Sequence, residues 1–463
     1  MNYVHKNTAS RREFLKTAGR VTAASALVGA GIPRVHAAES NTLQVALIGA
    51  GGRGTGAAAN ALSTKSGPIK LVAIADVFEN RAKSSFAALK QQFPKQFDVP
   101  EDRVFVGFDG YKKAMDCLRA GDVAIFASPP AFRWVHFAYA IQKGIHVFME
   151  KPVTVDGPST RKLLKLAEES VKKNLKVGVG LMSRHSRALQ ELADRIRNGE
   201  IGEIILMRGF RVHGPIGYFS SLPKPQDMSE LLYQVQRFHS FLWASGGCFS
   251  DFYIHIIDHC GWMKGAWPVK ATGLGGRHYR QSREGATYVD QNFDVYSVEY
   301  EFADGTTFIM DGRCMSGCDD RYSSYAQGTK GLAIISAHGD CGMPSRIYKG
   351  PLASRANLLW ESKVKPEQQN PYQNEWDELV AAIRQDKPYN EAKRGAEASL
   401  VTSMGRMAAH TGRVITYEQI LNCDHEFAPQ VDKLAMDSPA PLQAGPDGRY
   451  PVPQPGIVTT REY

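Results

Sequence analysis

The feature that most constrains this chain is a glycine-rich turn directly after a short hydrophobic segment. Residues 43–48 (LQVALI) have the pattern of a buried strand, and an alanine-rich stretch that favours a helix follows the turn. In this context the spacing G-x-G-x-x-G is typical of dinucleotide binding, because the turn lets the backbone approach a pyrophosphate and the helix N-terminus presents free N–H groups to it. The residues predicted to bind the cofactor here are Gly49, Gly51, Gly52, Arg53 and Gly54.

An acidic residue ends the second predicted strand, residues 70–76 (KLVAIAD). Asp76 stands about 20 residues beyond the turn, where a carboxylate accepts hydrogen bonds from the adenosine ribose. The same carboxylate would repel a 2′-phosphate, so NAD is favoured over NADP. Arg53 and Arg81 keep NADP open as an alternative.

Strands and helices alternate through the first part of the chain. Further strands are predicted at 104–108, 123–127, 146–149 and 176–181, with helices at 80–92, 134–143 and 158–174. This alternation predicts an α/β fold, with a Rossmann domain built on a doubly wound parallel sheet over residues 43–183.

Beyond residue 184 the pattern changes to strands without intervening helices. They are predicted at 204–212, 269–273, 293–302, 306–311 and 332–336, with helices at 376–386 and 391–411. This indicates an α+β domain over 184–423 with a large, mainly antiparallel open sheet. The helix near 392–411 could pack back on the first domain. Residues 424–463 are rich in Pro and Gly and predict an extended arm, packed on the body or a partner, or disordered.

The N-terminus carries a pattern of its own. Residues 10–16 (SRREFLK) match a twin-arginine export signal, followed by a weakly apolar stretch and a possible cleavage site at 35–37. An amphipathic helix or a membrane anchor is the alternative, but the apolar stretch is short of the ~20 residues that span a bilayer. Residues 1–37 are therefore predicted to be a removed signal that the twin-arginine machinery reads. The mature protein would be periplasmic, without stable membrane anchoring, and its cofactor tightly bound.

The charge balance agrees with this interpretation. The chain has 56 Lys+Arg, 47 Asp+Glu and a net charge of +9. Six bases and one acid lie within residues 1–37, so this segment carries five of the nine units. A nucleic-acid partner is therefore not expected. The chain has seven cysteines, none in a Cys-x-x-Cys pattern, and no metal site is predicted.

Polar residues follow two neighbouring strands of the predicted parallel sheet. Ser128 and Pro129 come after the strand at 123–127, before a helix containing His136. Glu150 and Lys151 come after the strand at 146–149. The carboxyl ends of parallel strands meet at the edge where ligands bind, so these residues are predicted to lie at the cofactor site.

The chain resembles the Gfo/Idh/MocA oxidoreductase family from about residue 43 to 421, and its signal is similar to that of exported members. The resemblance rests on the glycine turn, on Glu150-Lys151-Pro152, on 246–258 (GGCFSDFYIHIID), on 328–331 (GTKG) and on 376–379 (WDEL). It implies that Lys151, Asp251 and His255 are catalytic and contact substrate, that the domain over 184–423 serves substrate binding and oligomerisation, and that the protein is a homo-oligomer, a dimer or tetramer. Cys248 departs from the Gly-rich family pattern.

The residues themselves point to the same chemistry. Asp251 and His255 are four apart, so they share one face of a helix. His255 could act as general base on a sugar hydroxyl, Asp251 could orient the imidazole, and Lys151 could stabilise the developing alkoxide. An exposed i,i+4 ion pair is the alternative for Asp251 and His255, but apolar neighbours disfavour it.

Other polar and aromatic residues are weaker candidates. Arg184 and His185 follow the sixth strand, where family members place substrate contacts. The long loop 214–240 is the candidate wall of the substrate pocket. Residues that could line the site or serve structure alone are His213, His239, Trp243, Tyr253, Asp258 and His259.

These observations lead to an exported NAD-dependent oxidoreductase that acts on a hydroxyl of a sugar, polyol or derivative. One alternative is an NAD-dependent glycoside hydrolase or lyase that works through transient keto-sugar oxidation. The family's glycosidases replace the lysine of Glu-Lys-Pro, so Lys151 favours net oxidoreduction. The alternative from another class is a non-catalytic sugar-binding protein.

Overall fold

A computed structural model describes residues 41–278, 280–341 and 343–463 of this chain. Residues Thr42–Tyr463 form one compact unit. The predicted export signal at 1–37 lies outside the described residues. Within the described residues, no helix combines the length and hydropathy needed to cross a membrane.

A six-stranded parallel sheet forms the N-terminal half of this unit. Its strand order is β3-β2-β1-β4-β5-β6, which confirms the predicted doubly wound sheet. The order runs outward in both directions from β1 and β4, so a ligand crevice is expected at the carboxyl ends of these two strands. The strands are β1 (Leu43–Ile48), β2 (Ile69–Asp76), β3 (Val104–Val106), β4 (Val123–Phe126), β5 (His146–Met149) and β6 (Val177–Val179).

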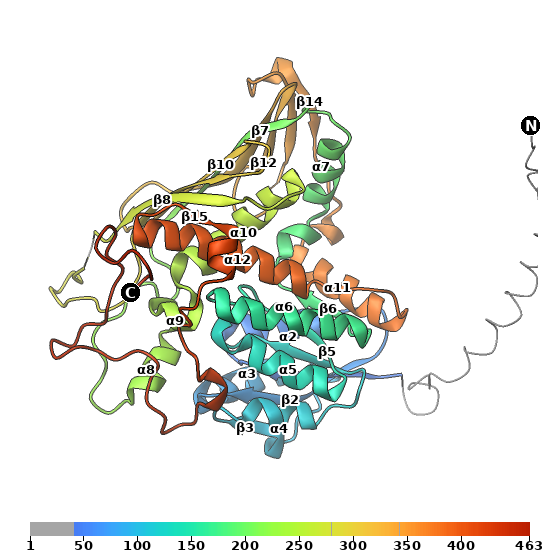
Figure 1. The fold of residues 1–463 in the computed structure, drawn as a ribbon. Helices are drawn as coiled ribbons and strands as arrows, with labels where there is room; N and C mark the ends of the chain where they lie inside the picture. Colours follow the sequence, from blue (N-terminus) through green and yellow to red (C-terminus); the bar gives the residue numbers. More distant parts are fainter. Residues whose placement is uncertain (1–40, 279, 342) are drawn as a thin grey trace, which may run out of the picture. The chain divides into compact units, whose positions relative to one another are not determined.

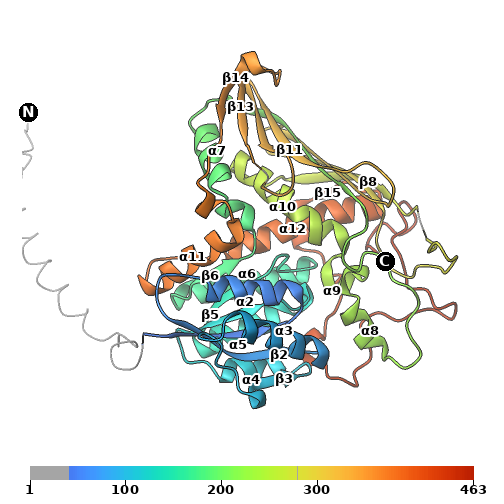
Figure 2. The same cartoon turned by 180° about the vertical axis from the view of Figure 1, so that it is seen from behind.

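Helices cover both faces of this sheet, which is why its central strands read as continuous apolar runs. Figures 1 and 2 show the helices around the sheet from opposite sides. The helices are α2 (Gly52–Leu62), α3 (Glu79–Gln92), α4 (Gly110–Asp116), α5 (Arg133–Lys143) and α6 (Gly157–Lys172), together with α11 (Pro371–Arg384) from later in the chain.

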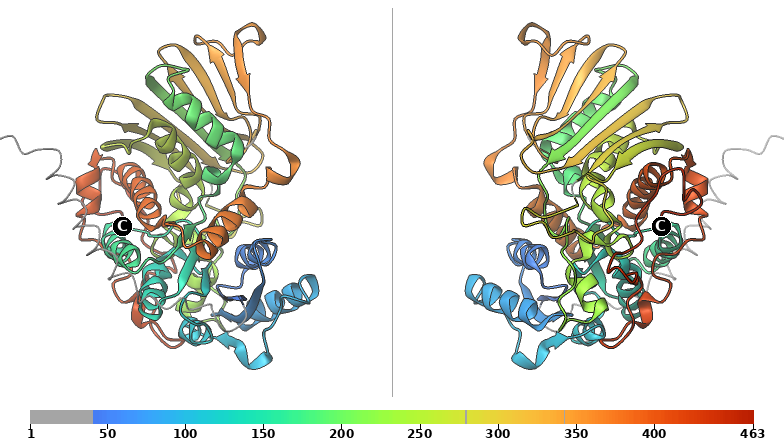
Figure 3. Two further views of the ribbon diagram at one scale, coloured as in Figure 1. Left: turned by 90° about the vertical axis from the view of Figure 1, so that its right-hand side faces the viewer. Right: turned by 90° about the vertical axis from the view of Figure 1, so that its left-hand side faces the viewer.

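The second sheet has nine strands and is mainly antiparallel, as predicted. Within this sheet, the β7–β10 pair is the only parallel one among the described strands. Figure 3 shows this sheet above the Rossmann sheet from both sides. In spatial order the strands are β14 (Leu358–Glu361), β13 (Arg346–Lys349), β12 (Gly331–Ser336), β11 (Arg321–Gly328), β7 (Ile204–His213), β10 (Thr307–Cys314), β9 (Val295–Glu301), β8 (Lys270–Gly276) and β15 (Ile415–Thr416).

Two helices connect this sheet to the Rossmann half. Helix α10 (Gly247–Lys264) is buried over almost its whole length and packs against β7. Helix α12 (Ala392–Thr411) contacts β8 on one side and α6 on the other (Figure 1). Ser399 of α12 accepts a hydrogen bond from the backbone N of Val153 at 3.0 Å. Helix α12 thus supports the segment that follows the predicted catalytic lysine.

The C-terminal arm packs on the body of the same chain. It follows α13 (Tyr417–Leu421) and passes α8 (Glu230–Gln236) and α9 (Leu242–Ser245) (Figure 1). Its apolar side chains belong to one buried cluster with residues of α8 and α9. Near its end, Glu462 is 2% exposed and binds Arg406 of α12 through two hydrogen bonds of 2.8 Å.

Candidate active site

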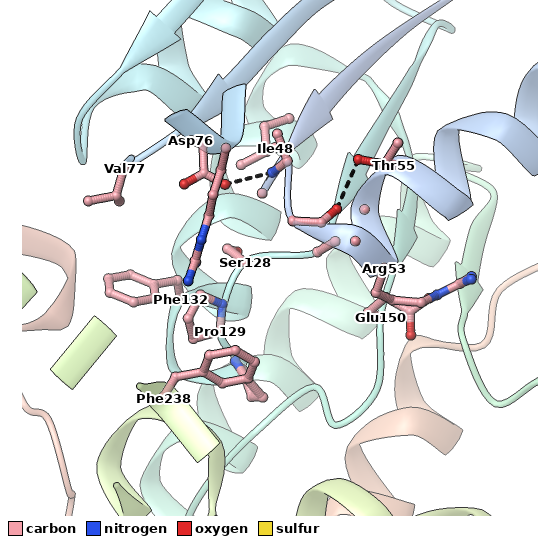
Figure 4. A pocket seen from close by; sticks show the side chains of 18 of the residues that line it. Ile48, Arg53, Thr55, Asp76, Val77, Ser128, Pro129, Phe132, Glu150 and Phe238 are labelled. Atoms are coloured by element: carbon pink, nitrogen blue, oxygen red, sulfur yellow. Dashed lines mark hydrogen bonds and ion pairs between the residues drawn. The ribbon is translucent and has the colours of Figure 1, made fainter. Parts of the chain in front are cut away.

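One cavity of about 870 Å³ opens at the carboxyl edge of the Rossmann sheet. Residues from both halves of the compact unit line it. They include every residue predicted to bind the cofactor and the three predicted catalytic residues: Gly49, Gly51, Gly52, Arg53, Gly54, Asp76, Ser128, Pro129, His136, Glu150, Lys151, Asp251 and His255. Figure 4 shows the part of this cavity that lies over the glycine turn.

The glycine turn has the geometry that a pyrophosphate requires. Gly49 has φ +91°, and a Cβ there would lie 2.3 Å from the backbone N of Ser128. A Cβ on Gly54 would lie 1.9 Å from the carbonyl oxygen of Gly49. In contrast, nothing lies within 4 Å of a Cβ on Gly51 or Gly52. Among the described residues, no side chain caps the N-terminus of α2, so its N–H groups can bind an anion.

Asp76 stands at the end of β2 and is fixed by the backbone around it. Its Oδ2 accepts from the N–H of Ala50 at 2.7 Å (Figure 4), and its Oδ1 accepts from the N–H of Phe78 at 2.9 Å. Burial raises the pKa of this carboxyl, against the effect of these hydrogen bonds. Each oxygen keeps a free lone pair, so Asp76 can accept hydrogen bonds from ribose hydroxyls.

Arg53 is held away from Asp76. Its Nε lies 2.5 Å from Oε1 of Glu150, and its guanidinium stands over the ring of Tyr372 at 4.6 Å. In Figure 4, Arg53 lies beside Glu150, whereas Asp76 is on the other side of the turn. Arg53 is therefore not placed to bind a 2′-phosphate, which removes one of the two arguments for NADP.

A buried arginine that the sequence analysis did not identify supports the edge of the cavity. Arg133, at the start of α5, is 2% exposed. Its Nε donates to the carbonyl oxygen of Glu150 at 3.0 Å, and its Nη1 donates to Oγ of Ser128 at 3.0 Å. It thus ties the ends of β4 and β5 together. Burial, and then the charge of Arg133, lowers the pKa of the neighbouring His136 to about 3, so His136 is neutral at pH 7.

Lys151 and Asp251 meet across the boundary between the two sheets. The Nζ of Lys151 donates to the backbone oxygen of Asp251 at 2.5 Å and lies 3.4 Å from its Oδ1. The Oδ2 of Asp251 lies 3.0 Å from Nε2 of His239. Although burial alone would raise the pKa of Asp251, the charge of Lys151 and the hydrogen bond from His239 hold that pKa well below its usual value. Asp251 therefore stays ionised.

The role predicted for Asp251 changes in one respect. Its carboxylate contacts Lys151 and His239, and no hydrogen bond joins it to His255 in the described residues. The physical reason is that a buried carboxylate gains most from the ammonium group nearest to it. Asp251 thus orients Lys151 and the loop that carries His239. Both nitrogens of His239 are in use, because its Nδ1 accepts from the N–H of Tyr218 at 3.2 Å.

His255 lines the cavity one helical turn beyond Asp251. The side chain is almost buried, and its Nδ1 has no hydrogen-bond partner in the described part of the chain. Burial, and then the charges of Lys151 and Arg211, lowers the pKa of His255 well below its usual value. The ring is therefore neutral at pH 7 and can accept a proton from a group in the cavity.

The structure does not bring Arg184 and His185 to the cavity. Arg184 forms a two-pronged ion pair with the buried Asp258, with distances of 2.8 to 3.0 Å. His185 contacts Glu378 at 2.7 Å and Glu391 at 3.3 Å. Although burial alone would lower it, these carboxylates raise the pKa of His185 to about 10. Neither residue lines the cavity, so the predicted substrate contacts have no geometric basis here.

Among the weaker candidates, some line the cavity and others do not. Of these, His239 lines the cavity, together with three more residues of the predicted wall loop, Tyr218, Val235 and Phe238. The others make contacts elsewhere: His213 with the backbone oxygen of Gly214, Trp243 with Gln234, Tyr253 with Cys314, Asp258 with Arg184 and His259 with Ser324. The backbone N–H of Cys248, which departs from the family pattern, donates to Asn292. In the described residues, no group of His, Cys, Asp or Glu side chains could hold a metal ion.

Three further lining residues come from later in the chain, and the sequence analysis did not identify them. Arg211 lies on β7, Asp340 follows β12, and Tyr372 opens α11. They are far apart along the chain and share no motif spacing. Only the pairing of β7 with β11, and the turn after β12, bring the first two beside the Rossmann edge.

Comparisons with known proteins agree with this geometry. A model of the Gfo/Idh/MocA oxidoreductase family, described as an NAD-binding Rossmann fold, matches residues 43–195. Inositol 2-dehydrogenase 1 of Paenarthrobacter aurescens is 29% identical over 170 residues, which are 36% of this chain and 45% of that protein. The chain thus matches about half the length of this curated relative.

Solved structures extend the similarity to the second sheet. Aldose-aldose oxidoreductase from Caulobacter crescentus superimposes with a TM-score of 0.60 at 17% identity, over 81% of this chain and 99% of that one. Myo-inositol 2-dehydrogenase from Lactobacillus plantarum gives a TM-score of 0.59 at 21% identity, over 81% and 99%. At this identity the likeness concerns the fold alone. Over residues 43–195 the chain is thus similar to the NAD-binding Rossmann domain of the Gfo/Idh/MocA oxidoreductase family.

Proposed function

We propose that this chain is an NAD-dependent oxidoreductase that transfers hydride between a sugar or polyol hydroxyl and nicotinamide. The observation that carries the proposal is a single cavity in which the dinucleotide turn, Lys151, Asp251 and His255 meet. The matched relatives include several inositol 2-dehydrogenases, which supports a polyhydroxylated substrate.

Different residues of the chain have different roles around the reacting carbon. When bound, NAD supplies the hydride acceptor. The neutral ring of His255 takes the proton of the substrate hydroxyl. The Nζ of Lys151, fixed by the backbone oxygen of Asp251, donates a hydrogen bond to the same oxygen and stabilises its developing negative charge. Asp251 keeps Lys151 in place, and Asp76 and the glycine turn hold the dinucleotide.

An absorbance assay at 340 nm tests this proposal. Purified protein with NAD and a panel of neutral sugars and inositols is expected to gain absorbance with at least one substrate. Release of a chromogenic aglycone without net change at 340 nm would favour the glycoside hydrolase instead. Sugar binding without either signal would favour a non-catalytic binding protein.

Asp76 is expected to set the preference for NAD. Asp76→Ala removes the acceptor for the ribose hydroxyls and the charge that repels a 2′-phosphate. We expect NAD affinity to fall by about 10- to 100-fold, the effect of one hydrogen bond to a charged group, and NADP affinity to rise. Fluorescence titration with NADH and NADPH measures both. Unchanged affinity for both cofactors would contradict this assignment.

The N-terminal pattern supports a further proposal, that the protein is exported by the twin-arginine pathway. Arg11→Lys with Arg12→Lys keeps the charge of the segment but removes the signal. We expect the wild type in the periplasmic fraction of a producing bacterium and the double variant in the cytoplasm. Immunoblots of the two fractions measure this, and Lys6→Arg is the control. Equal distribution of both forms would contradict the proposal.

A further inference from the structure

Two ionisable residues in the cavity have no part in the chemistry described so far. Arg211 lies on β7 of the nine-stranded sheet, and Asp340 lies in the turn after β12, four residues beyond the end of that strand. They line the same cavity as Lys151 and His255.

Arg211 forms no ion pair within 4 Å in the described residues and is held by an aromatic ring. Its guanidinium stands 3.7 Å over the ring of Tyr322, which is its cross-strand neighbour on β11. Its Nε is buried without a hydrogen-bond partner in the described residues. Burial lowers its pKa, and the charge of Asp340 opposes this effect. The group remains a cation that is fixed by stacking and has donors to offer.

Asp340 is also held through its backbone. Its carbonyl oxygen accepts from Oγ of Ser183 at 3.1 Å, and the N–H of the preceding Gly339 donates to the carbonyl oxygen of Tyr322 at 3.0 Å. Its Oδ1 is buried without a hydrogen-bond partner among the described residues. Burial raises its pKa to about 6, and the charges of Arg211 and Lys151 act against this rise.

An unpartnered buried donor and acceptor are costly, and proteins usually satisfy such groups. A hydroxyl group can donate to a carboxylate and accept from a guanidinium, so neighbouring hydroxyls of one molecule satisfy both groups. A carboxylate or phosphate would pair with Arg211 but would be repelled by Asp340 and Asp251. The charges on this side of the cavity sum to zero, because two cations, Lys151 and Arg211, stand against two anions, Asp251 and Asp340.

We propose that Arg211 and Asp340 form a subsite that binds hydroxyls on the non-reacting carbons of the substrate, and so selects the carbon that meets Lys151 and His255. This inference rests on the proposed oxidoreductase function and adds two specificity-determining residues to it. It also predicts that an uncharged substrate is preferred to one carrying a carboxylate.

Steady-state kinetics with deoxy sugars test the subsite. The substrates are myo-inositol, D-glucose, the 2-, 3- and 6-deoxy forms of D-glucose, and D-glucuronate. The variants are Asp340→Asn and Arg211→Met, with Asp447→Asn, an exposed carboxylate of the C-terminal arm, as the control. NADH binding, followed by fluorescence, verifies that each variant keeps the cofactor site.

In the wild type we expect at least one deoxy analogue to lose about 10- to 100-fold in kcat/KM, the value of a hydrogen bond to a charged group. Asp340→Asn and Arg211→Met should raise KM for the parent sugar by a similar factor and abolish the discrimination against that analogue, with a much smaller effect on kcat. The control should behave as wild type.

Two results would contradict the subsite while leaving the proposed function intact. The subsite is excluded if the variants discriminate among the analogues as the wild type does, or if the wild type prefers glucuronate to glucose. If the wild type neither turns over nor binds any of the neutral compounds while NADH binds, the proposed function itself is wrong, and the subsite falls with it.

Discussion

Replacing His255 with alanine is expected to lower kcat by about 10²- to 10⁴-fold, the usual contribution of a general base. The imidazole is neutral at pH 7 and lines the cavity, and in the described residues its Nδ1 has no hydrogen-bond partner, so the substitution removes the proposed proton acceptor. Lys151→Met, which keeps the length of the side chain, should have an effect of similar size because it removes the donor to the reacting oxygen. Rates at 340 nm with saturating NAD measure both.

The control for His255 is His338→Ala, because His338 is an exposed histidine outside the cavity. NADH affinity should stay within a few-fold of wild type in every variant, which separates lost chemistry from a damaged cofactor site. A base must be deprotonated to act, and the lowered pKa of His255 moves the acid limb of the kcat profile below pH 6.5. Near-normal kcat in either active-site variant would contradict the assigned role.

The second large effect concerns stability. Glu462→Ala is expected to lower the free energy of unfolding by about 3–5 kcal/mol, the cost of leaving a buried charge without its partner. Arg406 is fully buried and would keep hydrogen bonds only to uncharged oxygens, of Val155, Gly246 and Ser250. Those three residues belong to the segment after Lys151 and to the start of α10. Urea unfolding followed by fluorescence measures the change.

Asp447→Asn in the same arm is the matched control, since its side chain is exposed. Although burial would raise it, Arg406 lowers the pKa of Glu462 to about 2 from an ordinary value of 4.5. A lowered carboxyl pKa stabilises the fold fully above pH 4.5, and this contribution is lost as the pH falls towards 2. The effect of the substitution should therefore be complete at pH 7. A change below 1 kcal/mol there would show that Arg406 tolerates the loss.

Most of the Rossmann half could be predicted because local pattern and tertiary environment agree there. Its core strands are buried on both faces, so each reads as an apolar run ended by a turn or polar residue. The second sheet was predicted less completely, and strand β11 (RYSSYAQG) was missed. Its buried side chains are small or polar, such as Ser324 and Ala326, so it has no hydrophobic alternation to detect.

The candidate site also contains residues that could be predicted from the sequence and residues that could not. The glycine turn and the pair Asp251 and His255 could be predicted to lie at the cavity because each combines particular residue types at a fixed spacing. Arg184 and His185 were predicted at the correct strand end, but they form ion pairs with Asp258, Glu378 and Glu391 instead. Several polar side chains lie at this edge of the sheet. Tertiary packing determines which of them find ion-pair partners elsewhere and which face the cavity.

The sequence by itself determined the fold class, the dinucleotide turn, and the lysine, aspartate and histidine of the cavity, because these depend on local periodicity and short spacings. The tertiary structure alone decided that Asp251 binds Lys151 and His239, and that Arg211 and Asp340 face the same cavity. Those contacts join residues from different strands, helices and loops. Their geometry is set by how the two sheets pack through α10 and α12, and no short-range pattern encodes that packing.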